Sequence, residues 1–371
     1  MARWISLPKL GTNMESAVVL AWLKREGDAV AQGTPLVEVE TDKASFVVEA
    51  EVAGTLAAVQ VAEGETAFVR EPLAAILEPG ETDADAPPVP PAGPGRDHLQ
   101  RVRSGWRASA ARPERGEAAA MAPAARTLAR NAGLAPDALA WAANGKVLTT
   151  SDVAELLEAP RAVIYGAGLG GKQVLEVLRS SRRFLPIAFV DDDDSLHGTC
   201  LGGLPVLSER EGVTERRPDA VLLSFHSEVR RRIYLRLAGE GVPMPPLVDA
   251  RAMVGSGLKA MLGDGVLVEA GAVLGPDVTV GDGAIVDIGA VIAHDCAIGA
   301  HCHVSPGASV SGAVDLGDNV LIGVGASVNS TVRIGSGTIV APGSAVMNDL
   351  PADVIAAGVP ARVIGESKRN A

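Results

Sequence analysis

The chain has 371 residues, enough for two to four domains, and its 45 acidic and 33 basic residues give a formal net charge of −12. This acidic balance argues against a nucleic-acid-binding protein, and an aromatic content of 3% provides few rings on which bases could stack. The three cysteines lack metal-ligand spacing, so we expect no metal site and small core cysteines in a reducing compartment: Cys200, Cys296 and Cys302.

The first residues contain no apolar stretch of the kind found in signal peptides, and no apolar run in the chain is long enough to cross a bilayer. We therefore expect a cytoplasmic protein with no membrane partner.

Residues 1–78 alternate short β-type runs with glycine-containing turns, which predicts a small all-β sandwich. In the middle, Glu40-Thr-Asp-Lys43-Ala44 places one lysine in a turn between two strands. This segment resembles the lipoyl domains of 2-oxoacid dehydrogenase complexes, whose modified lysine sits in the same Glu-Thr-Asp-Lys-Ala hairpin. The resemblance implies that Lys43 carries a lipoyl group, whereas a biotin carrier would show Met-Lys-Met.

Residues 79–120 are rich in Pro, Ala and Arg and cannot build a core, so we expect an extended, semi-rigid linker. An alternative is that the arginines in its second half dock weakly on an acidic partner.

Residues 121–158 predict a small helical domain, with helices over Pro123–Arg130 and Thr150–Leu157. This segment resembles the peripheral subunit-binding domain that follows lipoyl domains, which implies 2-oxoacid dehydrogenase components as candidate partners. The central loop Ala142–Lys146 departs from the family's glycine-rich loop and is shorter.

Residues 160–250 predict a Rossmann-like α/β domain that binds a nucleotide sugar. A Gly-x-Gly-x-x-Gly turn containing Gly166 and Gly168 follows a strand and opens a helix, and the next strand ends in Asp191 and Asp192. Such a turn offers backbone N–H groups to phosphate, and the acid binds the ribose or base. The segment lacks a second mononucleotide half, so we expect a nucleotide site without hydride chemistry. The alternative is a glycine turn that serves only helix packing.

Residues 251–371 carry an aliphatic residue at every sixth position from Leu262 to Val346, which predicts a hexapeptide-repeat parallel β-helix. Glycines follow many of these positions, where a Cβ would crowd the backbone. The register is Leu262, Val268, Leu274, Val280, Val286, Ile292, Ile298, Val304, Val310, Leu316, Ile322, Val328, Ile334, Val340 and Val346.

Two histidines, His294 and His303, stand outside this register and should face outward, and Asp295 adjoins the first of them. With three six-residue repeats per coil, nine residues are half a coil, so the two histidines should lie on different sides. They could then meet only across a subunit contact.

The region from residue 161 to 365 resembles the sialic acid O-acetyltransferase and UDP-4-amino-sugar N-acetyltransferase family of left-handed β-helix enzymes. The resemblance implies a homotrimer, with acetyl-CoA in the groove between subunits and a nucleotide sugar held by the α/β domain. The matching segments are Tyr165–Gly168, Phe189–Asp192, Glu228–Tyr234, Ala293–Cys296, His301–Gly307 and Gly358–Ala361.

Carried over by position, His294 is the general base, Asp295 supports it and His303 approaches the thioester carbonyl. Asp191 and Asp192 would contact the nucleoside. Phe225-His226 stands where the family usually has Gly-Asn. The pantetheine path would be lined by Gly312, Val324, Ala341 and Pro342.

These features predict an acyltransferase that moves an acyl group from acyl-CoA, or from a lipoyl thioester, to an amino or hydroxyl group of a sugar or nucleotide sugar. One alternative is a non-catalytic lipoyl carrier or assembly subunit of a 2-oxoacid dehydrogenase complex, although the dehydrogenase acyltransferase motif His-x-x-x-Asp-Gly is absent from the sequence. Another is a sugar-nucleotide-binding protein with an inactive solenoid.

Overall fold

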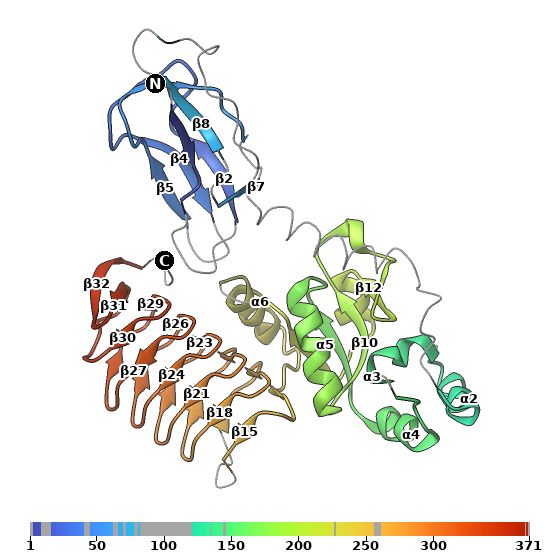
Figure 1. The fold of residues 1–371 in the computed structure, drawn as a ribbon. Helices are drawn as coiled ribbons and strands as arrows, with labels where there is room; N and C mark the ends of the chain where they lie inside the picture. The colour runs from blue at the N-terminus through green and yellow to red at the C-terminus, as the bar shows by residue number, and fades with distance from the viewer. Residues whose placement is uncertain are drawn as a thin grey trace. The chain divides into compact units, whose positions relative to one another are not determined.

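The computed structural model falls into two compact units, Met1–Val102 and Arg103–Ala371 (Figure 1). It describes residues 3–8, 16–40, 45–61, 66–69, 72–77, 81, 121–134, 136–143, 146–225, 228–255, 261–367 and 369. The five-part division expected from the sequence is finer than this and stays a prediction. None of the helices in the described ranges combines the length and apolarity needed to cross a membrane.

The described part of the first unit contains two four-stranded antiparallel sheets that share one aliphatic core. β4 and β5 pair with Glu40 opposite Ser45, as the predicted hairpin requires, whereas Lys43 lies outside the described residues. One sheet comprises β1 (Arg3–Ser6), β8 (Pro72–Leu77), β6 (Gly54–Ala57) and β3 (Ala29–Val30), and the other comprises β5 (Ser45–Glu49), β4 (Pro35–Glu40), β2 (Ser16–Trp22) and β7 (Thr66–Phe68).

The second unit begins with short helices at the places that the sequence predicted. The last of them starts with a capping box, in which Thr149 and Asp152 satisfy each other's backbone N–H groups. These helices are α2 (Pro123–Asn131), the 3₁₀ turn η2 (Pro136–Leu139), α3 (Ala140–Ala143) and α4 (Thr150–Glu158).

The short helices share a hydrophobic core with the α/β part that follows them. Trp141 and Leu156 are fully buried in the same cluster as the side chains of α5 (Leu169–Ser181). Arg179 donates to the Trp141 carbonyl at 2.5 Å, and Arg182 forms an ion pair with Asp152 at 3.1 Å. A fragment beginning at residue 160 would therefore expose apolar surface on α5.

The α/β part contains a five-stranded sheet in which four neighbouring strands are parallel, in the order β12, β10, β9, β13. An antiparallel β11–β12 hairpin at its edge was not predicted. The elements are β9 (Arg161–Tyr165), β10 (Leu185–Val190), η3 (Asp194–Leu196), β11 (Cys200–Leu201), β12 (Leu204–Leu207), the π-helical turn η4 (Arg210–Glu215), β13 (Ala220–Leu223) and α6 (Glu228–Gly239).

The C-terminal part is a parallel β-helix with three sheets, seen in Figure 1 as a stack of short orange strands. We name the sheets after their first strands. The β14 sheet contains β14 (Leu247–Val248), β17 (Leu267–Val268), β20 (Ile285–Val286), β23 (His303–Val304), β26 (Leu321–Ile322), β29 (Ile339–Val340), β31 (Val354–Gly358) and β32 (Ala361–Glu366). The β15 sheet contains β15 (Met253–Val254), β18 (Val273–Leu274), β21 (Val291–Ile292), β24 (Ser309–Val310), β27 (Ser327–Val328) and β30 (Ala345–Val346). The β16 sheet contains β16 (Met261–Leu262), β19 (Thr279–Val280), β22 (Ala297–Ile298), β25 (Asp315–Leu316) and β28 (Arg333–Ile334).

The six-residue register forms the interior of this helix, as predicted. Val268 pairs with Val286 and Val286 with Val304, so one coil takes eighteen residues. The register residues are buried in one continuous core, apart from the partly buried Leu262 at its start. A Cβ at Gly281 or Gly299 would lie within 2.6 Å of backbone atoms in the next coil, which explains why glycine follows the aliphatic residue.

A buried arginine on α6 joins the α/β part to the β-helix. Arg230 donates to the carbonyls of Gly265 at 2.5 Å and Gly283 at 3.1 Å, and also to Leu223 at the end of β13. Nearby, Tyr234 on α6 packs edge-on against His301, with ring centroids 5.1 Å apart. These contacts make the α/β part and the β-helix one body.

Candidate functional site

His294 and Asp295 occupy an exposed turn at the β15–β16 corner, the set of turns that link β15-sheet strands to β16-sheet strands. The His294 Nδ1 atom lies 2.7 Å from Asp295 Oδ2, and both side chains are 61% exposed. A carboxylate in this position favours the tautomer that carries its proton on Nδ1. Nε2 is then the ring nitrogen that can accept a proton.

Gly312 lies directly beside the His294 ring, one coil further along the chain. A Cβ at this position would lie 2.6 Å from His294 Cε1 and 2.7 Å from Nε2. Van der Waals contact needs about 3.5 Å between such atoms, so any side chain here would displace the imidazole. Gly312 therefore makes room for the ring, and its role along a pantetheine path stays a prediction.

His303 lies on another face, in β23, as the half-coil spacing predicted. Its neighbour Val304 points into the core, so His303 is on the outer side of the strand. This outward orientation agrees with the prediction, but the side chain is only 10% exposed, and its Nε2 lies 3.1 Å from Oδ2 of the buried Asp287.

The residues predicted to line the donor path are divided between two corners. Gly312 shares the β15–β16 corner with His294, whereas Val324, Ala341 and Pro342 lie at the β14–β15 corner, in the turns between β14-sheet and β15-sheet strands. Within one chain the structure does not bring this second group to His294.

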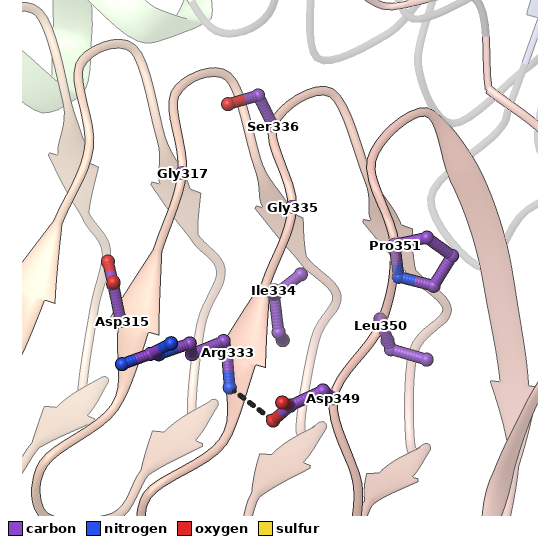
Figure 2. Close-up of a pocket in the computed structure, with 9 residues that line it drawn as sticks. All are labelled: Asp315, Gly317, Arg333, Ile334, Gly335, Ser336, Asp349, Leu350 and Pro351. Carbon is purple, nitrogen blue, oxygen red and sulfur yellow. Dashed lines mark hydrogen bonds between the residues drawn. The ribbon is translucent and has the colours of Figure 1, made fainter.

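An open groove of about 440 Å³ lies at the C-terminal end of the β16 sheet (Figure 2). The Arg333 backbone N–H donates to Asp349 at 2.8 Å. The Arg333 side chain extends toward the coil that contains Asp315 (Figure 2). No residue of the predicted site lines this groove. Its lining residues are Asp315, Gly317, Arg333, Ile334, Gly335, Ser336, Asp349, Leu350 and Pro351.

At the predicted nucleotide turn, the Asp191 carboxylate accepts hydrogen bonds from backbone N–H groups and so stabilises the loop. Its Oδ2 accepts from the Ala167 N–H at 2.7 Å and its Oδ1 from the Asp193 N–H at 2.9 Å. Asp192 is exposed at the same edge of the sheet, and its Oδ1 lies 2.9 Å from the Tyr165 hydroxyl. The contact of Asp191 with a nucleoside stays a prediction, and Asp192 is the more accessible of the two acids.

The glycines of this turn divide between packing and open space. A Cβ at Gly170 would lie 1.9 Å from the Ser224 carbonyl oxygen, and a Cβ at Gly171 would lie 2.2 Å from that of Gly166. Gly166 itself has a φ of 106°, a backbone conformation that favours glycine. A Cβ at Gly168, the N-cap of α5, would have no other atoms within 4 Å. Part of the motif thus serves helix packing, as the alternative interpretation held.

Sequence reasoning missed a row of buried acids at the β14–β15 corner. Asp249, Glu269 and Asp287 each follow a β14-sheet strand, in three successive coils. The only sequence signal was the eighteen-residue spacing between Glu269 and Asp287.

The N-terminal segment matches known carrier domains. Residues 4–76 match the family described as biotin-requiring enzyme. The chain is 42% identical over 82 residues to the pyruvate dehydrogenase E1 component subunit beta of Rhizobium meliloti, covering 22% of this chain and 18% of that protein. It is 32% identical over 161 residues to the dihydrolipoyllysine-residue succinyltransferase component of the 2-oxoglutarate dehydrogenase complex of Pseudomonas aeruginosa, covering 43% of this chain and 37% of that protein. The chain therefore spans well under half the length of these curated relatives.

Two solved structures match more than half of the chain. PerB from Caulobacter crescentus, in complex with CoA and GDP-perosamine, is 34% identical with a TM-score of 0.51, covering 55% of this chain and 97% of that one. The acetyltransferase domain of PglB from Neisseria gonorrhoeae, in complex with acetyl coenzyme A, is 29% identical with a TM-score of 0.51, covering 56% and 100%.

The arrangement of an α/β part followed by a parallel β-helix is the fold shared with these acetyltransferases. The chain belongs to the family of hexapeptide-repeat sugar acetyltransferases that PerB and the PglB domain represent, and it carries an additional domain of the biotin/lipoyl type. The resemblances to lipoyl domains and to sugar acetyltransferases are confirmed, whereas the resemblance of residues 121–158 to a subunit-binding domain stays a prediction. The three parallel sheets are consistent with the predicted left-handed β-helix fold.

Replacing Gly312 by alanine should move the His294 ring and break its bond to Asp295 while the fold stays intact, because the new methyl group meets only the end of a side chain. The ring ¹⁵N and ¹H signals of His294, together with a crystal structure, would report the shift. Gly365→Ala is the matched control, because no atom lies within 4 Å of its Cβ position. An unmoved ring in Gly312→Ala would contradict the packing described here.

Proposed function

We propose that the Arg103–Ala371 unit transfers an acyl group, with acetyl-CoA as the donor, to an amino or hydroxyl group of a sugar or nucleotide sugar. The observation that carries this proposal is the exposed His294–Asp295 pair, hydrogen-bonded at 2.7 Å in a β-helix turn. Related enzymes of this fold bind CoA with GDP-perosamine, or acetyl coenzyme A, which supports the choice of both substrates.

In the proposed reaction, His294 Nε2 removes a proton from the acceptor nitrogen or oxygen as that atom attacks the thioester carbonyl carbon. Asp295 accepts the Nδ1 proton in a hydrogen bond and stabilises the positive charge that forms on the ring. The carbon–sulfur bond then breaks, and the imidazolium returns the proton to the leaving thiolate. No covalent intermediate with the enzyme is needed.

The α/β part would hold the nucleotide. The open N-cap at Gly168 and the first N–H groups of α5 suit a phosphate, and the exposed Asp192 suits a ribose or base donor. Asp191 would act through the loop that it braces.

A homotrimer would complete the donor site. Within one chain, Val324, Ala341 and Pro342 lie at a different corner from His294, and His303 lies on a different face. If two subunits pack side by side, the β14–β15 corner of one can face the β15–β16 corner of the next, with the pantetheine arm between them.

Replacing His294 by alanine should lower kcat roughly 100-fold or more, a typical contribution from a general base, with the thermal unfolding midpoint unchanged. Asp295→Asn should lower kcat by a smaller factor, because the base remains. Release of CoA thiol with an amino-sugar nucleotide as acceptor would measure both. Asp277→Asn is the matched control, because Asp277 is an exposed acid with the same left-handed φ one coil earlier. Turnover near wild type in His294→Ala would rule out this base.

A site shared between subunits predicts complementation. His294→Ala and His303→Ala homo-oligomers should each be nearly inactive, but mixed oligomers formed by refolding the two together should recover part of the activity. Light scattering would give the oligomeric state. A monomeric mass at assay concentration, or no recovery in verified mixed trimers, would contradict the shared site.

The N-terminal domain would carry a lipoyl group on Lys43, and we propose that this arm delivers the acyl group to His294. An S-acyl lipoamide presents the same thioester as acyl-CoA, so the chemistry at the base would not change. A random-coil chain of about 40 residues would have an r.m.s. span of roughly 35 Å and a limit near 140 Å. The local concentration of a group on such a tether is on the order of millimolar.

The test uses Met1–Val102 with radiolabelled acetyl on lipoyl-Lys43, mixed with Arg103–Ala371 and an acceptor in the absence of CoA. The second fragment starts at 103 because the helices α2 to α4 share their core with α5. Label should reach the acceptor, and Lys43→Ala, which cannot be lipoylated, serves as the control. No transfer, where acetyl-CoA works under the same conditions, would show that the domain is only a docking or carrier module.

A further inference from the structure

Three carboxyl groups are stacked in the interior at the β14–β15 corner. Asp249, Glu269 and Asp287 are 1%, 2% and 5% exposed. Backbone bonds hold them in register, because the Asp249 N–H donates to Val268 and the Glu269 N–H to Val286. Adjacent strands lie about 4.8 Å apart, so the three side chains stack one above another.

Only one arginine, Arg251, forms an ion pair with these three acids among the described residues, so the positive charge nearby does not balance three carboxylates. Arg251 forms a fork with Asp249, at 2.9 Å from Nε to Oδ1 and 2.8 Å from Nη2 to Oδ2. The buried Arg230 acts on Glu269 only at a distance, since its guanidinium donates to backbone carbonyls. The described residues form no cluster that could hold a metal ion. Buried neighbouring carboxylates in this situation share a proton.

Hydrogen-bond donors reach two of the three acids. Burial raises the pKa of Asp249, but the hydrogen bonds from Arg251 outweigh it and hold that pKa below its usual range. Asp287 accepts from the Ile288 N–H at 2.7 Å through Oδ1, and Oδ2 lies 3.1 Å from His303 Nε2. These donors favour its ionised form.

Glu269 has no such support. Its Oε1 is buried and finds no hydrogen-bond partner among the described residues, and the acid one coil further along, Asp287, is also buried. Burial first, and then the charge of Asp287, raise the pKa of Glu269 to about 8.

We propose that Glu269 and Asp287 form a carboxyl pair sharing one proton, and that this pair positions His303 with Nε2 as its hydrogen-bond donor. The Glu269 O–H and the His303 Nε2–H both point at Asp287, so the ring is fixed in one orientation and one tautomer. The functional meaning rests on the proposed role of His303 at the thioester, but the pair itself can be tested without it. Glu269 and Asp287 are positioning residues in this scheme.

The first test measures thermal unfolding of the full-length chain between pH 5 and pH 9. A carboxyl group whose pKa is raised by folding keeps its proton in the folded chain and loses it in the unfolded chain, so its contribution to stability falls from about pH 4.5 to about pH 8 and then levels off. Glu269→Gln cannot titrate. Its Tm relative to wild type should therefore rise over this pH range and then stay constant. The charged groups that act on Glu269 are Asp249, Asp287 and Arg230, with Arg251 and His303 one contact further away.

Glu155→Gln, at an exposed acid on α4, is the matched control and should show no such rise. A Tm difference between Glu269→Gln and wild type that is independent of pH would mean that Glu269 is ionised, and the shared proton would be ruled out.

The second test reads the His303 tautomer from its ring ¹⁵N shifts. Wild type should be protonated on Nε2, and Glu269→Gln should match it because the amide N–H still donates to Asp287. Asp287→Ala should lose the preference for Nε2. The same tautomer in Asp287→Ala as in wild type would overturn the positioning role, even if the pH-dependent stability is found. Neither measurement needs catalytic activity, so failure of the proposed function would not be confused with failure of the carboxyl pair.

Discussion

The eighteen-residue coil of the β-helix is the constraint on which the rest of the second unit depends. Each strand pairs with the strand one coil away, so residues eighteen apart are held in contact. This register puts Gly312 against the ring of His294 and Glu269 against Asp287. Because the register residues form one continuous core, a strand cannot shift its pairing register to relieve a clash in its own coil. Chemistry that needs fixed distances can therefore be placed in short turns.

Two further contacts extend this rigidity beyond the β-helix. Arg230 ties α6 to the carbonyls of two coils, and α5 shares its core with the short helices before it. The segment that resembles a subunit-binding domain is thus packed onto the α/β part.

The chain combines a biotin/lipoyl-type domain with a second unit that resembles sugar acetyltransferases. The biotin/lipoyl-type domain matches proteins of 2-oxoacid dehydrogenase complexes, while the second unit matches enzymes crystallised with CoA. In the proposed reaction both donors present a thioester, and this shared chemistry would give a physical reason for the fusion.

The sequence by itself determined the elements that depend on local pattern. The six-residue register, the β4–β5 pairing around the predicted hairpin, the α2 and α4 helices and the adjacent His294 and Asp295 could all be predicted, because each follows from neighbours in the chain. Only the tertiary structure decided that His303 is buried against Asp287, that Asp191 braces its loop and that Arg230 joins two parts of the chain. These features depend on groups brought together from 16 to 53 positions apart. Their burial and proton sharing are set by that packing, which no local pattern encodes.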